Sequence, residues 1–412
     1  MTQTSSPPAQ RHRVKAELTR GWPVLVAATI GFGTGVSSLP FYTSGLFVPE
    51  LEAAFGWSRG QLSAIALYGS LVLIATAPLV GALVDRFGVR VPATISILAV
   101  SAAYFAMSVM GGAFAGYLLL SLGMYTFASA STPVSFTRAA SFGFDRLRGV
   151  ALGVVLAGAG ATAFLVPATM GTLIARDWRA GFAVLGLVAL AGAVVTFLLI
   201  NRTGHRREPR PATPFREVIP HVRTWLFARL TLAFAALALA VGGMPLHLVP
   251  LLRDAGVSPA AAAGTASLLG IALIIGRVGV GLLVDRFFAP RVTAAVVVLT
   301  AAGFAALLLA GPSMGIAAAL AVGLALGAEA DLIGYLTSRY FGLRRYGRIF
   351  GLFYMVFMAG IGFGPVLIDS LRAATGGYSI PLLASIALLL VAAVLFGTAP
   401  RFPADPEHAP AR

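Results

Sequence analysis

The chain has 412 residues, of which 58% are hydrophobic and only 11% are charged. This balance is typical of a protein that crosses a membrane many times, and it excludes an ordinary soluble domain. The absence of cysteine excludes disulfides and thiolate metal sites. A net charge of +15 could indicate a nucleic-acid partner, but the basic residues follow the positive-inside rule of membrane proteins, so we expect none.

Twelve apolar segments are long enough to cross a bilayer, which takes about 20 residues. They are Trp22–Pro49, Gln61–Val84, Val91–Met110, Phe114–Pro133, Gly149–Ala175, Gly181–Ile200, Trp225–Leu251, Ala260–Val284, Val292–Gly311, Met314–Leu336, Ile349–Leu371 and Ile380–Gly397. An even number of spans places both termini on one side of the membrane. That side carries 24 of the 30 Lys and Arg residues, so we predict that it is the cytoplasm.

The remaining basic residues are Arg277, inside a span, and five arginines on the opposite side: Arg59, Arg176, Arg179, Arg253 and Arg372. All but one of the 30 basic residues are arginine, and alanine is abundant. Both features are typical of a GC-rich bacterial genome. We therefore expect the bacterial inner membrane, with the lipid bilayer as the surrounding medium and a monomer as the assembly.

A basic, proline-containing segment at 201–223 separates spans six and seven and has no apolar face. We predict a cytoplasmic tail at 1–21, a six-helix bundle at 22–200, a cytoplasmic linker at 201–223, a second six-helix bundle at 224–397 and a cytoplasmic tail at 398–412. Within the linker, Pro214–Arg223 could instead form an amphipathic helix on the membrane surface.

Two sequence echoes indicate that the halves arose by duplication. Residues 81–87 (GALVDRF) recur at 281–287 (GLLVDRF), an offset of 200 residues, and both copies end the second span of their half. A looser pair, 141–149 and 340–347, lies between spans four and five of each half. Six-helix repeats of this kind build a large class of secondary transporters.

The pattern Gly81, Asp85, Arg86, Gly88 and Arg90 resembles the loop signature of the major facilitator superfamily. The second copy departs from it, with Phe288 in place of the second glycine. Residues 41–63, the Gly-Arg of span eight and residues 327–342 are similar to the monocarboxylate and oxalate/formate group. The aspartate of that group would fall at Leu273, and its span-eleven lysine is missing between Ile349 and Leu371. The resemblance implies an all-α fold of twelve transmembrane helices in two pseudo-symmetric six-helix bundles.

Three charges lie well inside the predicted spans: Arg277, Glu329 and Asp331. An arginine deep in hydrocarbon is costly and usually faces a wet cavity or a counter-ion. Arg277 and Asp331 each lie about 12 Å from the inner end of their helix, so a salt bridge between them is geometrically reasonable. Glu329 and Asp331 point about 200° apart, so only one can face the pathway.

We predict that Arg277 binds an anionic group of the substrate, such as a carboxylate, and that Glu329 or Asp331 carries a proton or holds Arg277 when the site is empty. A purely structural ion pair is the alternative. Tyr42, Thr43 and Tyr354 are further candidates for substrate contact. His247, near the outer end of span seven, is either a proton-relay residue or a histidine satisfied at the interface. No acids or histidines stand at metal-ligand spacing, so we expect no metal and no cofactor.

The repeated Asp-Arg pairs end the second spans, and Arg138 and Arg339 end the fourth spans. By resemblance to the family, these residues form a cytoplasmic gate; otherwise they are topology-setting surface charge. The expected gate residues are Asp85, Arg86, Arg90, Arg138, Asp285, Arg286 and Arg339.

We therefore expect a secondary transporter of small organic anions, chiefly monocarboxylates, that works by alternating access with proton symport or anion exchange. The alternative is a proton-coupled efflux carrier for amphipathic compounds, in which Arg277 is structural. A membrane sensor or scaffold has no sequence feature in its favour. We expect no enzyme, because no HExxH or GxSxG pattern and no nucleophile–base pair is present.

Overall fold

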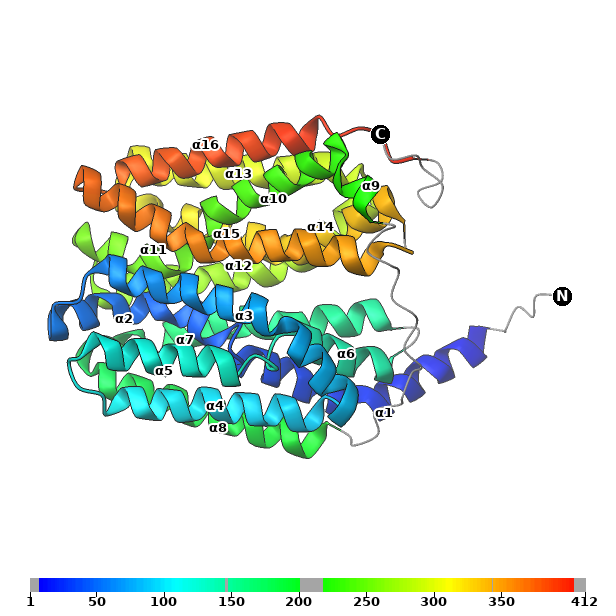
Figure 1. Ribbon diagram of the computed structural model, residues 1–412, viewed down its shortest axis with the longest axis horizontal. Coiled ribbons are helices and arrows are strands. Elements are labelled where there is room, and N and C mark those ends of the chain that lie inside the picture. Colours follow the sequence, from blue (N-terminus) through cyan, green and yellow to red (C-terminus); the bar gives the residue numbers. More distant parts are fainter. Residues whose placement is uncertain (1–6, 145–146, 201–217, 343, 404–412) are drawn as a thin grey trace. The chain divides into compact units, whose positions relative to one another are not determined.

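The computed structural model describes residues 7–144, 147–200, 218–342 and 344–403, and these ranges are helical with no strand (Figure 1). The α-helices are α1 Pro7–Thr34, α2 Leu39–Phe55, α3 Arg59–Phe87, α4 Arg90–Ser108, α5 Phe114–Phe127, α6 Pro133–Gly143, α7 Arg148–Arg176, α8 Trp178–Leu199, α9 Ile219–Val222, α10 Trp225–Gly242, α11 Met244–Asp254, α12 Pro259–Arg286, α13 Ala289–Ala310, α14 Gly315–Phe341, α15 Tyr346–Thr375 and α16 Ser379–Gly397, with a 3₁₀ turn at Gly311–Met314.

Nine of the predicted spans are single helices, and three are broken into two. The first span is α1 plus α2, the fourth is α5 plus α6, and the seventh is α10 plus α11. Each break lies at a proline or glycine: Pro40 begins α2 at its second residue, Pro133 opens α6, and Gly243 separates α10 from α11. Such residues interrupt the helical hydrogen-bond ladder.

Ten continuous helical segments of the described chain are long and apolar enough to cross a membrane. One of them, Ala289–Glu329, contains both α13 and the start of α14, and the broken fourth span is not among the ten. Counting these two cases separately accounts for the twelve predicted spans. Many of the observed helices are longer than the predicted spans, because they continue past the apolar residues into polar ends.

The helices of the first span extend beyond the predicted apolar segment at both ends. The first span was expected to stop at Pro49, but α2 continues through it to Phe55, and α1 already begins at Pro7. Transmembrane helices tolerate an internal proline because neighbouring helices compensate for the lost hydrogen bond. Residues 1–6, 201–217 and 404–412, which contain most of the predicted linker and parts of both predicted tails, lie outside the described residues. The short helix α9 occupies the end of the linker.

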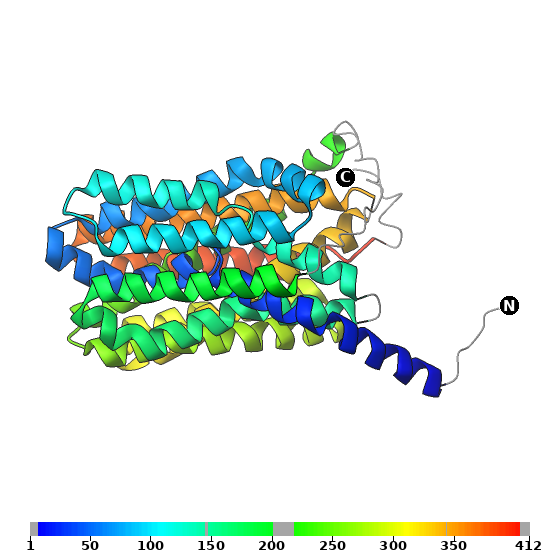
Figure 2. The same ribbon diagram turned by 90° about the horizontal axis from the view of Figure 1, so that it is seen from below.

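The helices fall into two compact units whose boundaries cut through α2, α3 and α7. Unit 1 comprises Met1–Phe41, Ala75–Thr162 and Arg179–Arg207, and unit 2 comprises Tyr42–Ile74, Ala163–Trp178 and Glu208–Arg412. Parts of the first, second and fifth spans therefore pack with the C-terminal half of the chain. Within each unit, most of the long helices lie side by side and run in similar directions, whereas α1 slants away from its neighbours (Figures 1 and 2).

Small polar side chains join the helices of unit 1 where the backbones come close. Thr162 of α7 donates to the Gly33 carbonyl of α1 at 2.7 Å, and Ser101 of α4 donates to the Gly186 carbonyl of α8 at 2.8 Å. At the break in the first span, the backbone NH of Val36 donates to Ser131 Oγ at 3.0 Å. These bonds satisfy polar groups that hydrocarbon cannot solvate.

In unit 2, α12 packs along α14, α13 packs on α14 and α16, and α10 packs on α15 and α16. Phenylalanines fill the space between α10, α15 and α16. The Phe227 and Phe353 rings stack at 4.8 Å, and Phe234 meets the Phe396 ring edge-on at 5.1 Å. The three intramembrane charges lie on the neighbouring helices α12 and α14, which pack along each other.

Candidate functional site

The seam between α12 and α14 places Arg277 and Glu329 next to each other. A Cβ on Gly327 would lie 2.2 Å from the Leu273 carbonyl oxygen, and one on Gly276 would lie 2.5 Å from the Leu324 carbonyl oxygen. Only glycine allows backbones to approach this closely, as in other membrane helix pairs with small residues at their contact. The seam thus brings the neighbours of these glycines, Arg277 and Glu329, to adjacent places on the two helices.

Arg277 and Glu329 both hold buried polar atoms without a partner. Nε and Nη1 of Arg277 and Oε2 of Glu329 are buried and make no hydrogen bond. The two side chains nevertheless interact electrostatically. Buried polar atoms are normally hydrogen-bonded, so each exception needs an explanation. Buried guanidinium donors without a partner suit an anionic ligand.

Asp331 differs from Glu329 in its surroundings. Asp331 is exposed, whereas Glu329 is partly buried, as expected for positions about 200° apart on α14. Asp331 interacts electrostatically with Arg277 and with Tyr346 of α15. The expected salt bridge between Arg277 and Asp331 is absent from the ion pairs of the described residues. Both acids act on Arg277 through space, and Glu329 is the more enclosed of the two.

Two of the predicted contact residues join this group. Tyr42 of α2 interacts electrostatically with Glu329, Arg277 and Tyr354, and Tyr354 of α15 interacts with Glu329 and Arg277. Thr43 is buried on α2 with 1% exposure.

An aromatic row on α15 leads to Tyr354 and was not singled out from the sequence. The rings of Tyr346 and Phe350 stack at 5.5 Å, and those of Phe350 and Tyr354 stack at 5.7 Å. The i, i+4, i+8 spacing of the three residues was the available signal.

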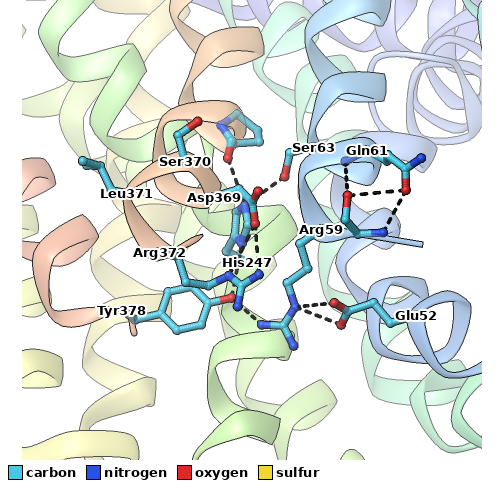
Figure 3. Close-up of polar contacts among 12 residues, drawn as sticks. Glu52, Arg59, Gln61, Ser63, His247, Asp369, Ser370, Leu371, Arg372 and Tyr378 are labelled. Carbon is cyan, nitrogen blue, oxygen red and sulfur yellow. Dashed lines mark hydrogen bonds and ion pairs between the residues drawn. The ribbon is translucent and has the colours of Figure 1, made fainter. Parts of the chain in front are cut away.

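His247 lies in a second polar group of unit 2, formed by residues of α2, α3 and α11 and by the connection between α15 and α16 (Figure 3). His247 is 1% exposed, and both of its ring nitrogens have hydrogen-bond partners. Nε2 lies 3.1 Å from the Pro365 carbonyl oxygen and 3.2 Å from Ser63 Oγ, and Nδ1 lies 3.3 Å from Tyr378 Oη. The ring of His247 is therefore held by hydrogen bonds at both nitrogens.

Arg59 is the centre of that group. Its Nε donates to both carboxylate oxygens of Glu52 at 3.0 and 2.8 Å, and its two terminal nitrogens donate to Asp254 at 2.5 and 2.8 Å. Nη1 also donates to Tyr378 Oη at 2.8 Å. We call Glu52, Arg59, Ser63, His247, Asp254 and Tyr378 the Arg59 cluster.

The sequence pattern places Arg59 only among the five arginines of the non-cytoplasmic side and does not predict this cluster. The signal available was the coincidence of arginines and acids at neighbouring span ends: Arg59 and Arg253 with Glu50, Glu52 and Asp254. Pairing them requires knowing which ends meet.

The comparisons with known proteins decide the family. The sequence model of the major facilitator superfamily matches residues 30–365. The chain belongs to this superfamily. It is accordingly a multi-pass membrane protein of a transporter family, and superfamily members are not enzymes.

Two curated relatives are similar over nearly the whole chain. Monocarboxylate transporter 11 of Mus musculus is 28% identical over 406 residues, covering 92% of this chain and 88% of its own length. Monocarboxylate transporter 13 of Bos taurus is 27% identical over 392 residues, covering 93% and 90%. A solved bacterial homologue of the human lysosomal transporter Spinster, inward-facing and unoccupied, has a TM-score of 0.70 at 17% identity and covers 93% of this chain and 96% of its own. It shows the shared fold.

The superfamily signature is structurally asymmetric between the two halves. In the first half, Arg138 Nη1 pairs with Asp85 Oδ1 at 2.5 Å, and the Arg90 guanidinium lies 4.1 Å from the centre of the Phe197 ring. In the second half, Arg339 stacks over Phe402 at 4.9 Å.

The other predicted gate residues are Arg86, Asp285 and Arg286, and all three are exposed. Arg86 lies over the ring of its neighbour Phe87 at 5.2 Å. Among the described residues, the aspartate of the signature thus forms an ion pair with the arginine of the fourth span only in the first half, where the signature is complete.

Proposed function

We propose that this chain carries small monocarboxylates across a membrane by alternating access, with Arg277 as the residue that binds the carboxylate. The observation that carries the proposal is the pair of buried, unpartnered donors Nε and Nη1 of Arg277. A carboxylate beside these donors accepts charge-assisted hydrogen bonds, which are stronger than neutral ones. The names of the two curated relatives support the same substrate class.

Glu329 is proposed as the group that couples the substrate to a proton. It interacts with Arg277 and leaves Oε2 buried and unpartnered. An ionised Glu329 neutralises Arg277 and weakens the attraction for an incoming anion. A protonated Glu329 leaves the charge of Arg277 to the substrate, so anion and proton bind together, which is symport. Exchange of one anion for another needs no change at Glu329.

Tyr42 and Tyr354 are proposed to line the same site, because both interact with Arg277 and Glu329. Their hydroxyls can donate to a carboxylate, and their rings can cover a short apolar chain. Asp331 and His247 take no coupling role in this scheme. Asp331 is the more exposed acid, and both nitrogens of His247 are engaged in the Arg59 cluster.

The test is uptake of labelled lactate, pyruvate, acetate, oxalate and an aromatic acid into proteoliposomes, with and without an inward proton gradient. Arg277→Gln removes the proposed carboxylate ligand, and Arg291→Gln, at an exposed arginine of α13, is the matched control. We expect saturable uptake of a monocarboxylate that is lost in Arg277→Gln and kept in Arg291→Gln.

Dependence on the gradient separates symport from exchange. If no acid is carried, or if Arg277→Gln transports normally, the carboxylate proposal is wrong. Uptake or extrusion of amphipathic compounds in the same vesicles would then favour the efflux carrier.

The location is also a proposal. The arginine distribution favours cytoplasmic termini, and the composition favours a bacterial inner membrane. Reporter fusions at both termini, one active only in the cytoplasm and one only outside it, test the orientation.

A further inference from the structure

We propose that Arg59 is a positioning residue that latches one end of the transport pathway shut, and that the Arg59 cluster must dissociate in every transport cycle. This inference rests on the proposed alternating access. The cluster joins α2 and α3, from the first and second spans, to α11 of the seventh span and to Tyr378, which precedes α16. It therefore connects segments from both halves of the sequence.

The guanidinium of Arg59 is nearly saturated by its partners. Arginine has five N–H donors, and here they serve both oxygens of Glu52, both oxygens of Asp254 and the hydroxyl of Tyr378. The Arg59 side chain is 9% exposed, whereas those of Glu52 and Asp254 are 27% and 43% exposed. One buried cation thus holds two acids from different helices, which would repel each other without it.

A directed series of hydrogen bonds continues from Arg59 toward α15. The Pro365 carbonyl can only accept, so we assign the ring proton of His247 to Nε2. Nδ1 then accepts from Tyr378 Oη, and Tyr378 Oη accepts from Arg59 Nη1 (Figure 3). The series fixes neutral His247 in one tautomer and ties the latch to the proline site of α15.

Further charges beside the cluster belong to the same end of unit 2. Arg253 Nη1 pairs with Glu50 Oε1, and Arg372 Nη2 pairs with Asp369 Oδ1 at 3.3 Å. A Cβ on Gly60, next to Arg59, would lie 2.9 Å from Asp369 Oδ2. Together with the cluster, this end holds three arginines and four acids, which leaves one negative charge in excess.

The backbones also meet here without intervening side chains. A Cβ on Gly45 of α2 would lie 2.4 Å from the Pro245 carbonyl oxygen and 2.8 Å from that of Leu246. The segments Tyr42–Ile74 and Ala163–Trp178 pack with unit 2 although α2, α3 and α7 continue into unit 1. An opening at this end has to separate α2 and α3 from α11, and the Arg59 cluster is the polar contact that resists it.

A latch of polar groups suits repeated opening. Each bond broken in the cluster can be replaced by a bond to water once the end opens, so opening leaves no unsatisfied charge in hydrocarbon. An apolar seal of the same extent would expose hydrophobic surface to water at every cycle.

The test is a distance measurement that needs no substrate. The chain lacks cysteine, so spin labels can be attached at Ala54→Cys, at the exposed end of α2, and Ala374→Cys, at the exposed end of α15. Double electron–electron resonance is recorded on the full-length protein in lipid nanodiscs. We expect one closed distance in the otherwise wild-type chain. Arg59→Gln should add a longer distance and raise the open-to-closed ratio about tenfold or more, as expected for the loss of a charge-assisted bond.

Control variants distinguish a latch that opens during transport from a cluster that only stabilises the fold. Arg176→Gln, at an exposed arginine that ends α7, should leave the distances unchanged. Arg59→Lys should be intermediate, because one ammonium cannot replace the fork that holds two carboxylates. If Arg59→Gln does not fold, Tyr378→Phe removes one bond to Arg59 and one to His247 with little change in shape, and a longer distance is again expected.

Unchanged distances in folded Arg59→Gln, or in Tyr378→Phe if that is the variant obtained, would overturn the proposal. A longer distance in a protein that carries no monocarboxylate would support the latch while contradicting the proposed substrate. The two proposals therefore fail in different ways.

Discussion

Gly327→Ala tests whether the α12–α14 seam positions the charged site. The added Cβ would lie 2.2 Å from the Leu273 carbonyl oxygen and 3.1 Å from the Arg277 backbone nitrogen. A carbon and a carbonyl oxygen in contact need about 3.3 Å, so the helices must separate by about 1 Å at this point. The neighbouring atoms belong to the backbone and cannot rotate away.

The expected cost has a structural and a functional part. Overpacking of this kind destabilises a protein by about 1–3 kcal/mol. A shift of about 1 Å in an aligned polar site can lower a rate by about two orders of magnitude. We therefore expect monocarboxylate uptake to fall by about 100-fold, with a smaller proportional effect on stability.

The measurements are initial uptake in proteoliposomes and thermal unfolding of the purified protein. Gly279→Ala is the matched control, because it lies on α12 with nothing within 4 Å of its Cβ position. Gly323→Ala loosens the same seam one turn away, with its Cβ 2.2 Å from the Leu269 carbonyl oxygen. It should lower stability as Gly327→Ala does but affect uptake less. Normal uptake and stability in Gly327→Ala would refute the reasoning.

Three further predictions concern Glu329, Tyr378 and Asp85. Glu329→Gln should keep exchange of monocarboxylates but lose stimulation by an inward proton gradient, because an amide cannot take up the proton. The control Asp331→Asn should keep the stimulation. Uptake driven by the gradient in Glu329→Gln would show that the Glu329 carboxyl does not couple transport to protons. Burial raises the pKa of Tyr378 to about 12, although Arg59 beside it favours the phenolate. The stabilisation by the neutral phenol is thus complete below about pH 10, the pKa of an unperturbed tyrosine, and is lost as the pH rises through about 12. Thermal melts should show a smaller alkaline loss over this window in Tyr378→Phe than in wild type, and equal losses would contradict the assignment. Asp85→Asn should change stability by less than about 1 kcal/mol, because the Asp85 and Arg138 side chains are 64% and 37% exposed, and should slow uptake if the pair acts as a gate. Equal uptake rates in mutant and wild type would leave the pair as surface charge.

The membrane class, the number of spans and the family could all be inferred from the sequence. In the hydrocarbon core of a bilayer, a segment of about 20 apolar residues can satisfy its backbone hydrogen bonds on its own only as a helix. The intramembrane charges could also be identified from the sequence, since Arg277, Glu329 and Asp331 are charged residues within long apolar segments. Helix ends are less well predicted, because the apolar segment of the first span ends at Pro49 whereas α2 continues to Phe55.

The pairing of distant residues was decided only by the tertiary structure. Nothing in the sequence indicates that Arg59 meets Asp254, 195 positions away, or that His247 contacts both Ser63 and the Pro365 carbonyl. Glu329 and Asp331 look equivalent in sequence, and only helix rotation about the glycine seam encloses one and exposes the other. Local composition determines which segments become membrane helices, because the bilayer acts on each segment separately. Which polar groups face each other depends on how the helices pack, since that is set by contacts between segments far apart in the chain.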